Sequence, residues 1–228
     1  MQTSDTAPVS STRPYRPFLI LFAGFAILYL ALLPLYPYPG DAVLKVAPIL
    51  VLVWQATKFA PGPQRLLLLA ALIFSGLGDV ILTLSTPWAF PAGLGSFLIA
   101  QLVYAGLFFR SFTWQATRLF FLLVLLIHAS YFATLLMPRA GDLAFAISAY
   151  LAAISLMGIA SIFYRYNYLV MLGAAIFIVS DTLIAVNKFL LPFAGADLAI
   201  MATYYLAQIL IFQGVSAPKK PGANPHEN

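Results

Sequence analysis

The sequence predicts an all-α, polytopic membrane protein, on the strength of three observations. The 228-residue chain is 62% hydrophobic and 8% charged, with a mean hydropathy of +0.94, whereas soluble domains average about 25% charged residues. Apolar stretches of the roughly 20 residues needed to cross a bilayer recur along the chain. The alternating pattern of about ten residues per strand that is typical of membrane β-barrels is absent.

Eight such apolar stretches can be distinguished, so we predict eight transmembrane helices. Turn residues and charges separate them, as in PLYPYPGD and KFAPGPQR. Trp54, Trp88 and Trp114 lie near these breaks, as expected for aromatic side chains at a membrane interface. Polar tails over residues 1–16 and 216–228, expected to be disordered, flank a transmembrane domain over 17–215. The approximate limits of the stretches are 17–35, 42–59, 66–85, 88–109, 118–137, 142–163, 168–188 and 197–215.

The basic residues predict the orientation of these helices. With a cytoplasmic N-terminus, nine of the twelve Lys and Arg residues lie on the cytoplasmic side, and Lys45, Arg139 and Lys188 lie opposite. Cytoplasmic loops carry the excess of Lys and Arg, so both termini are expected in the cytoplasm. The predicted location is the inner membrane of a bacterial cell, or the endoplasmic reticulum of a eukaryotic one.

Two aspartates lie deep inside predicted spans: Asp79 in LIFSGLGDVILTL and Asp181 in AAIFIVSDTLIAV. A carboxylate at that depth costs about 2.5–3.5 kcal/mol on insertion scales, so such residues are functional candidates by default. Each lies thirteen residues after the start of its stretch, roughly 20 Å along a helix. Because the two helices run in the same direction, the carboxyl groups are expected at the same depth, facing one shared site.

The same segments suggest that the chain contains two parallel repeats of four helices. GDVILTL and SDTLIAV fall on the third helix of each half, and the next helix of each half carries a glutamine, Gln101 in IAQLV and Gln208 in LAQIL. Four helices return the chain to the side on which it began, so a duplication would give parallel repeats. The alternative is that apolar helices resemble one another without a common origin.

Other polar residues of the spans are candidates for substrate binding. Gln101 and Gln208 need several hydrogen-bond partners in a dry interior, which a ligand or neighbouring helices would supply. Tyr104 and Tyr204, one turn from the two glutamines, would be aromatic walls or donors. Lys45, near the non-cytoplasmic end, would either extend to the interface or turn inward toward the aspartates or a phosphate group.

Several further residues are expected to be structural. Ser75 and Thr83 share a helix face with Asp79, and Gly76 and Gly78 predict close helix packing there. His128 has no acidic neighbour in LLVLLIHASYF and is expected to be a core histidine with a hydrogen-bond partner.

The composition argues against several kinds of chemistry. The chain has no Cys, which removes disulfides, thiolate nucleophiles and zinc–cysteine sites. Only His128 would serve a serine triad, and no G-x-S-x-G motif is present. Two aspartates without a nearby imidazole pair are a poor metal site, so no metal or other cofactor is expected. Nucleic acid is not an expected partner, because the net charge of +5 is spread along loops.

Polar, glycine and aromatic residues recur over residues 40–213 in an order typical of one family. These are Lys45 and Pro48; Ser75, Asp79 and Leu82; Phe90, Gly93, Phe97 and Tyr104; Tyr150, Ser155 and Met157; and the run GAAIFIVSDTLIAVNKF followed by YYLAQILI. In these residues the chain resembles the YhhN family of eight-helix membrane proteins, which includes the TMEM86-type lysoplasmalogenases. Two positions depart from the family pattern. A histidine often stands where this chain has Gln101, and an early Lys-Pro pair is replaced by Lys45-Val-Ala-Pro48.

The resemblance implies hydrolysis of the vinyl ether bond of lysoplasmalogen, a lysophospholipid drawn from the membrane. The products would be a fatty aldehyde and glycerophosphoethanolamine or glycerophosphocholine. Vinyl ethers hydrolyse by protonation of carbon, and water captures the resulting oxocarbenium ion, as in glycosidases. Asp79 and Asp181 are the expected catalytic pair, one protonated and one ionised. The sequence leaves open which of them is the acid.

Two other functions stay open at this stage. A proton-coupled transporter would use the two aspartates as protonatable sites, although the spans show few polar residues and no clear mid-span break. A non-catalytic lipid-binding protein would result if Gln101 had removed the chemistry. No feature of the sequence predicts the oligomeric state.

Overall fold

The computed structural model describes residues 16–217 and confirms the all-α prediction. The predicted tails, apart from Arg16, Ser216 and Ala217, lie outside the described residues. Within the described range the only β pairing is an isolated bridge between Phe112 and Tyr164. The α-helices are α1 (Arg16–Leu32), α2 (Asp41–Ala56), α3 (Pro63–Ile81), α4 (Ala89–Phe109), α5 (Leu119–Leu136), α6 (Ala144–Ile162), α7 (Tyr168–Ala185) and α8 (Ala196–Ser216).

Short helical turns extend or join these helices. A π-helical turn, η5 (Val186–Leu190), continues α7 and carries Lys188 in its last turn. The other turns are the 3-10 segments η1 (Leu33–Leu35), η2 (Ala116–Arg118), η3 (Met137–Arg139) and η4 (Gly141–Leu143).

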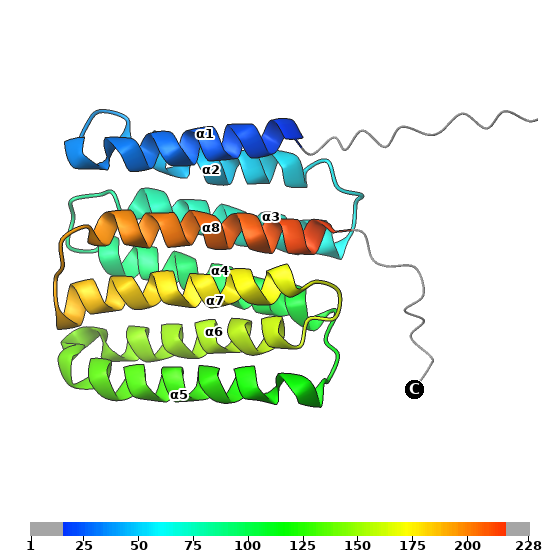
Figure 1. The fold of residues 1–228 in the computed structure, drawn as a ribbon. Helices are drawn as coiled ribbons and strands as arrows, with labels where there is room; N and C mark the ends of the chain where they lie inside the picture. The colour runs from blue at the N-terminus through cyan, green and yellow to red at the C-terminus, as the bar shows by residue number, and fades with distance from the viewer. Residues whose placement is uncertain (1–15, 218–228) are drawn as a thin grey trace, which may run out of the picture.

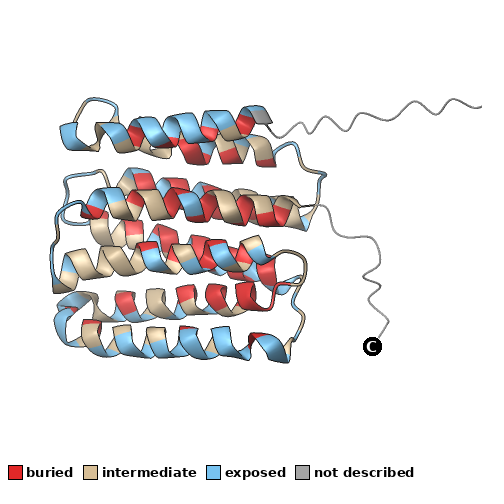
Figure 2. Cartoon of the chain, viewed as in Figure 1, coloured by how far each residue is buried: buried red, intermediate tan, exposed pale blue. Residues whose placement is uncertain are grey.

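The helices lie alongside one another in a bundle, with α1 and α5 on opposite flanks (Figure 1). The most extensive helix pairs are α7 with α8, α3 with α4, and α4 with α6. Buried residues concentrate on α4 and α8, whereas α5 is largely exposed (Figure 2). A bilayer accounts for that exposure, because lipid tails solvate the outer faces of membrane helices.

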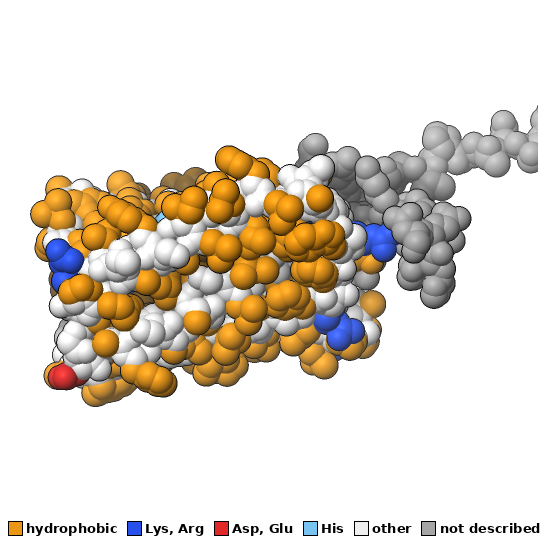
Figure 3. Space-filling model, turned by 90° about the horizontal axis from the view of Figure 1, so that it is seen from below, with side chains coloured by type: hydrophobic (Ala, Val, Ile, Leu, Met, Phe, Trp, Pro, Cys, Tyr) orange, Lys and Arg blue, Asp and Glu red, His pale blue; other side chains and the backbone are white. Residues whose placement is uncertain are grey.

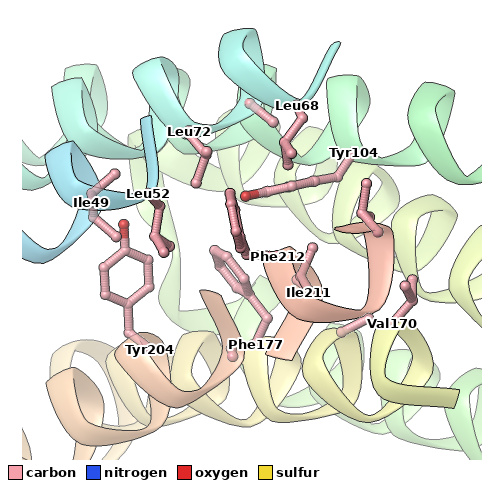
Figure 4. Packing of buried hydrophobic residues seen from close by; sticks show 14 of the residues in the cluster. Ile49, Leu52, Leu68, Leu72, Tyr104, Val170, Phe177, Tyr204, Ile211 and Phe212 are labelled. Atoms are coloured by element: carbon pink, nitrogen blue, oxygen red, sulfur yellow. The ribbon is translucent and has the colours of Figure 1, made fainter. Parts of the chain in front are cut away.

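The core consists of large apolar side chains between the central helices. Figure 4 shows Tyr204 extending from α8 toward Ile49 and Leu52 of α2. The other labelled members of this cluster are Leu68, Leu72, Tyr104, Val170, Phe177, Ile211 and Phe212.

Glycines set how closely two of the helix pairs approach. A Cβ added to Gly78 of α3 would lie 2.6 Å from the ring of Phe97 on α4, so the predicted close packing at this glycine is present. A Cβ on Gly173 of α7 would lie 2.8 Å from the backbone nitrogen of Ile211 on α8. Small residues at such crossings allow membrane helices to pack closely.

Seven of the described helices are long and apolar enough to cross a membrane. The exception is α2, whose 16 residues span about 24 Å, less than the ~30 Å hydrocarbon core. Eight full spans therefore remain a prediction, although α2 packs against both α1 and α3. Buried Pro48 lies inside α2, and because proline has no N–H it weakens the preceding helical turn.

Apart from Asp79 and Asp181, the charged side chains of the bundle lie toward its two ends. The start of α1 and the end of α8 lie at the same end of the bundle (Figure 1). Figure 3 shows that the charged side chains visible on that face gather at its two ends, with apolar side chains between them. The cytoplasmic position of the termini remains a prediction from the basic residues.

Candidate active site

Asp79, near the end of α3, is held by a tyrosine from α8. Its side chain is 2% exposed, and the Tyr204 hydroxyl donates a hydrogen bond of 2.7 Å to its Oδ2 atom. The Tyr204 ring packs edge-on against Phe97, with ring centroids 5.8 Å apart. The intramembrane carboxyl group therefore has the polar partner that its burial requires.

Asp181, on α7, has two donors from two other helices. The Tyr150 hydroxyl on α6 donates to Asp181 Oδ2 at 2.5 Å, and Gln101 Nε2 on α4 donates to the same oxygen at 3.4 Å. Both hydrogen bonds end on Oδ2, so Oδ1 is the oxygen left for other contacts. We did not predict a site role for Tyr150, although a mid-span tyrosine in a helix facing an aspartate is a signal for one.

Both aspartates line one cavity of about 270 Å³, here called the polar cavity. A cavity common to both aspartates is compatible with the predicted shared site, which stays a prediction. Its floor includes the buried residues Asp79, Tyr29 and Met201, while Lys188 and Asp197 are exposed at its open end. Its polar lining consists of Tyr29, Tyr36, Lys45, Asp79, Thr83, Ser180, Asp181, Asn187, Lys188, Asp197 and Tyr204.

A second cavity of about 90 Å³, here called the apolar cavity, lies among α4, α5, α6 and α7. Leucine, isoleucine and phenylalanine side chains form most of its wall. Five residues belong to the walls of both cavities, and Asp181 is the one polar member of this shared set. The other four are Leu82, Phe90, Phe97 and Ile184.

Two cations line the polar cavity. Lys45 projects from α2, one turn before Pro48, and its backbone carbonyl accepts a 2.7 Å hydrogen bond from the Tyr205 hydroxyl. The Lys45 ammonium interacts attractively with Asp79. The second cation, Lys188, lies 5.1 Å from the centroid of the Phe90 ring. Lys45 thus turns inward, one of the two arrangements considered from the sequence, whereas Lys188 was read only as a topology signal.

The two glutamines lie behind the cavity walls. Gln101 and Gln208 are both 0% exposed, and neither lines either cavity. Gln208 Oε1 accepts a 2.6 Å hydrogen bond from Tyr104, which also lines neither cavity. Of the five predicted substrate-binding residues, Lys45 and Tyr204 line the polar cavity, whereas Gln101, Tyr104 and Gln208 support the wall from behind.

The remaining polar residues follow the structural expectations in part. His128 lines the apolar cavity, and its Nε2 lies 3.1 Å from the Thr182 hydroxyl, the partner expected of a core histidine. Thr83 lies two residues beyond the end of α3, and its hydroxyl donates to the carbonyl of Val80. Ser75 is fully buried and its hydroxyl has no hydrogen-bond partner. Among residues 16–217, no group of three or more His, Asp or Glu side chains is arranged to hold a metal ion.

Comparison with known proteins places these residues in a family. The chain is 36% identical to the lysoplasmalogenase TMEM86B of Sus scrofa over 183 residues, covering 78% of this chain and 76% of that protein. It is 27% identical to the lysoplasmalogenase TMEM86A of Bos taurus over 231 residues, covering 94% and 95% of the two chains. It is also 27% identical to a lysoplasmalogenase of Mycobacterium bovis, covering 88% and 86%.

No solved structure matches the chain. The model of the YhhN family matches residues 40–215, a range that contains both aspartates, Tyr150 and every charged residue that lines the polar cavity. From this match and the relatives above, the chain belongs to the YhhN family.

Proposed function

We propose that this protein is a lysoplasmalogenase, an integral membrane hydrolase of the vinyl ether bond. The products are a fatty aldehyde and glycerophosphoethanolamine or glycerophosphocholine. Family membership and the names of the curated relatives support the reaction class. The observation that carries the proposal is the position of Asp181, the one polar residue in the wall shared by the polar and apolar cavities.

The two cavities match the two halves of a lysoplasmalogen. The part of the alkenyl chain next to the vinyl ether occupies the apolar cavity, where Leu125, Phe132 and Ile154 line the wall. The glycerophospho headgroup occupies the polar cavity, which opens at a charged end of the bundle. The vinyl ether lies between chain and headgroup, and therefore beside Asp181.

The chemistry requires one protonated and one ionised carboxyl group. The acid donates its proton to the vinyl carbon remote from the ether oxygen, which leaves an oxocarbenium ion at the carbon bonded to oxygen. Water adds to that carbon, and the ionised carboxylate accepts the proton that water releases. The resulting hemiacetal collapses to the aldehyde and the glycerol hydroxyl. One water is consumed, with no oxidant, reductant or metal.

The geometry favours Asp181 as the acid and Asp79 as the base. Asp181 lies at the junction, beside the reacting carbons, and its Oδ2 is occupied by Tyr150 and Gln101. Its Oδ1 is therefore the oxygen that delivers the proton. Asp79 lines only the polar cavity, where water and the developing positive charge are both accessible. Gln101, which stands where the family often has a histidine, positions the acid through its amide.

A proton-coupled carrier is the second candidate, and one observation favours it. Hydrogen-bonding side chains lead from Asp79 into the buried part of the bundle: Tyr204 contacts Asp79 and Gln208, and Gln208 in turn contacts Tyr104. Chains of this kind serve as proton relays in transporters. In a hydrolase Tyr204 holds Asp79 in place, and Gln208 and Tyr104 form a separate buried hydrogen bond behind it.

The deciding experiment is aldehyde release by purified protein in nanodiscs given a lysoplasmalogen. Wild-type protein should release aldehyde from the vinyl ether lipid and none from the saturated alkyl ether analogue. Asp79→Asn and Asp181→Asn should each lower kcat by the 10²–10⁴-fold typical of a lost general acid or base. Asp142→Asn is the matched control, because Asp142 is exposed and lines neither cavity. Wild-type rates from a folded Asp181→Asn protein would refute the mechanism.

A further inference from the structure

The open end of the polar cavity carries charges of both signs from three separate elements. Lys45 comes from α2, Lys188 from the π-helical turn after α7, and Asp197 from the first turn of α8. Tyr36, in the connection between α1 and α2, lines the same cavity. None of these residues takes part in the acid–base chemistry, so their convergence on the cavity needs another explanation.

The two lysines are available to bind an anion. Within residues 16–217, Lys188 forms no salt bridge, and its ammonium group lies over the face of Phe90. Lys45 and Asp79 line the same cavity, and Lys45 forms no salt bridge with Asp79. Two ammonium groups on one cavity wall, held by different helices, suit a phosphate group, which lysine binds as a point charge.

The carboxylate and tyrosine at the same end are suited to a cation. Asp197 and Tyr36 line the same cavity, and burial, followed by the charges of Asp41 and Asp197, raises the pKa of the Tyr36 phenol. A carboxylate beside an aromatic ring is a common arrangement for binding an alkylammonium group, through charge attraction and a cation–π contact. Asp197 and Tyr36 are both exposed, as a subsite at the water-facing end should be.

We infer that this end of the cavity is a binding subsite for a zwitterionic phosphodiester headgroup. Lys45 and Lys188 hold the phosphate, and Asp197 with Tyr36 holds the terminal ammonium of ethanolamine or choline. The inference rests on the proposed function, because it positions the headgroup of the same substrate. Lys188 follows Asp181 by seven residues, about 10 Å along a helix, an interval that the glycerol unit occupies.

The test compares three substrates that carry the same alkenyl chain. They are lysoplasmenylethanolamine, the phosphate monoester without an amine, and alkenylglycerol without phosphate. For Lys188→Gln and Lys45→Gln, kcat/KM for either phosphate substrate relative to alkenylglycerol should fall about tenfold, equivalent to 1.4 kcal/mol. For Asp197→Asn, kcat/KM for the ethanolamine substrate relative to the phosphate monoester should fall about fivefold. Arg139→Gln and Asp142→Asn, which change charges near the same end outside the cavity, should leave these ratios unchanged.

A second measurement compares soluble competitors with the wild-type protein and with the Asp197→Asn variant. Glycerophosphoethanolamine should inhibit aldehyde release competitively and more strongly than inorganic phosphate, and Asp197→Asn should remove the difference. Equal inhibition by the two compounds, or substrate ratios unchanged in all three variants, would overturn the headgroup subsite. Absence of aldehyde from every substrate with wild-type protein would instead refute the proposed function, so the two failures are distinguishable.

Discussion

Replacing Tyr150 with phenylalanine removes the shorter of the two hydrogen bonds to Asp181 and little else. The phenol donates to Asp181 Oδ2 at 2.5 Å, and its ring lines the apolar cavity. Phenylalanine keeps the ring, so the shape of the apolar cavity is preserved. Gln101 remains as the second donor, at the longer distance of 3.4 Å. The Asp181 carboxyl group then loses the contact that directs Oδ1 toward the substrate.

The size of the expected effect follows from that contact. As Asp181 gives up its proton it becomes a carboxylate, and a hydrogen bond to a charged group contributes about 1.5–3 kcal/mol. Each 1.36 kcal/mol of barrier is a factor of ten in rate. Tyr150→Phe should therefore lower kcat by about 10- to 150-fold. KM should change little, because the chain-binding surface is retained. The loss should be smaller than that of Asp181→Asn, since the acid itself remains.

The assay is steady-state aldehyde release in nanodiscs, with thermal unfolding measured in parallel. Tyr104→Phe is the matched control, because Tyr104 is also buried and donates a 2.6 Å hydrogen bond, yet lines neither cavity. It should lower stability without the same loss of kcat. In an Asp181→Asn background, Tyr150→Phe should have almost no further effect, because residues that act as a unit are not additive. A folded Tyr150→Phe protein with wild-type kcat would refute the positioning role.

Three further predictions concern the catalytic pair, the family position and the helix packing. The double variant Asp79→Asn with Asp181→Asn should lose little more activity than either single variant, so multiplicative losses in kcat would argue against one shared step. Gln101→His should retain or raise kcat if histidine positions Asp181 equally well, and a fall of tenfold or more in kcat would show that it does not. Gly173→Ala should lower the free energy of unfolding by about 1–3 kcal/mol, because its Cβ would overpack against the α8 backbone. Gly106→Ala is the control, because a Cβ there meets nothing within 4 Å. Thermal unfolding in detergent measures both variants, and equal unfolding temperatures would contradict the packing argument.

A fifth prediction concerns topology. Reporter fusions at the two termini should both report the cytoplasm, because the termini lie on the side of the membrane that carries most of the Lys and Arg residues. Reporter activity outside the cytoplasm at both ends would reverse the orientation of the bundle, and would place the open end of the polar cavity on the cytoplasmic side. Activity outside at only one end would contradict the prediction of eight spans.

Local chemistry explains why the sequence predicted the helices and the two aspartates. Hydrophobic length alone marks a membrane span, so the observed helices begin and end close to the predicted limits, for example Ala89–Phe109 against 88–109. The cost of a charge in the bilayer identified Asp79 and Asp181 without any knowledge of their neighbours. The sequence did not predict that α2 is shorter than a full span. Neither Pro48 nor the earlier end of the helix changes the apolar pattern of this stretch.

The tertiary structure decided which residues meet. Helices that are apolar on all sides carry little periodic signal of which face is inward, so the sequence did not reveal that Tyr150 faces Asp181 or that Gln208 lies behind the cavity wall. Lys188 and Asp197 were read as flanking charges, since their convergence depends on how α7 packs against α8. That packing rests on the contact of Gly173 with the α8 backbone, a fit between two surfaces that neither helix encodes by itself.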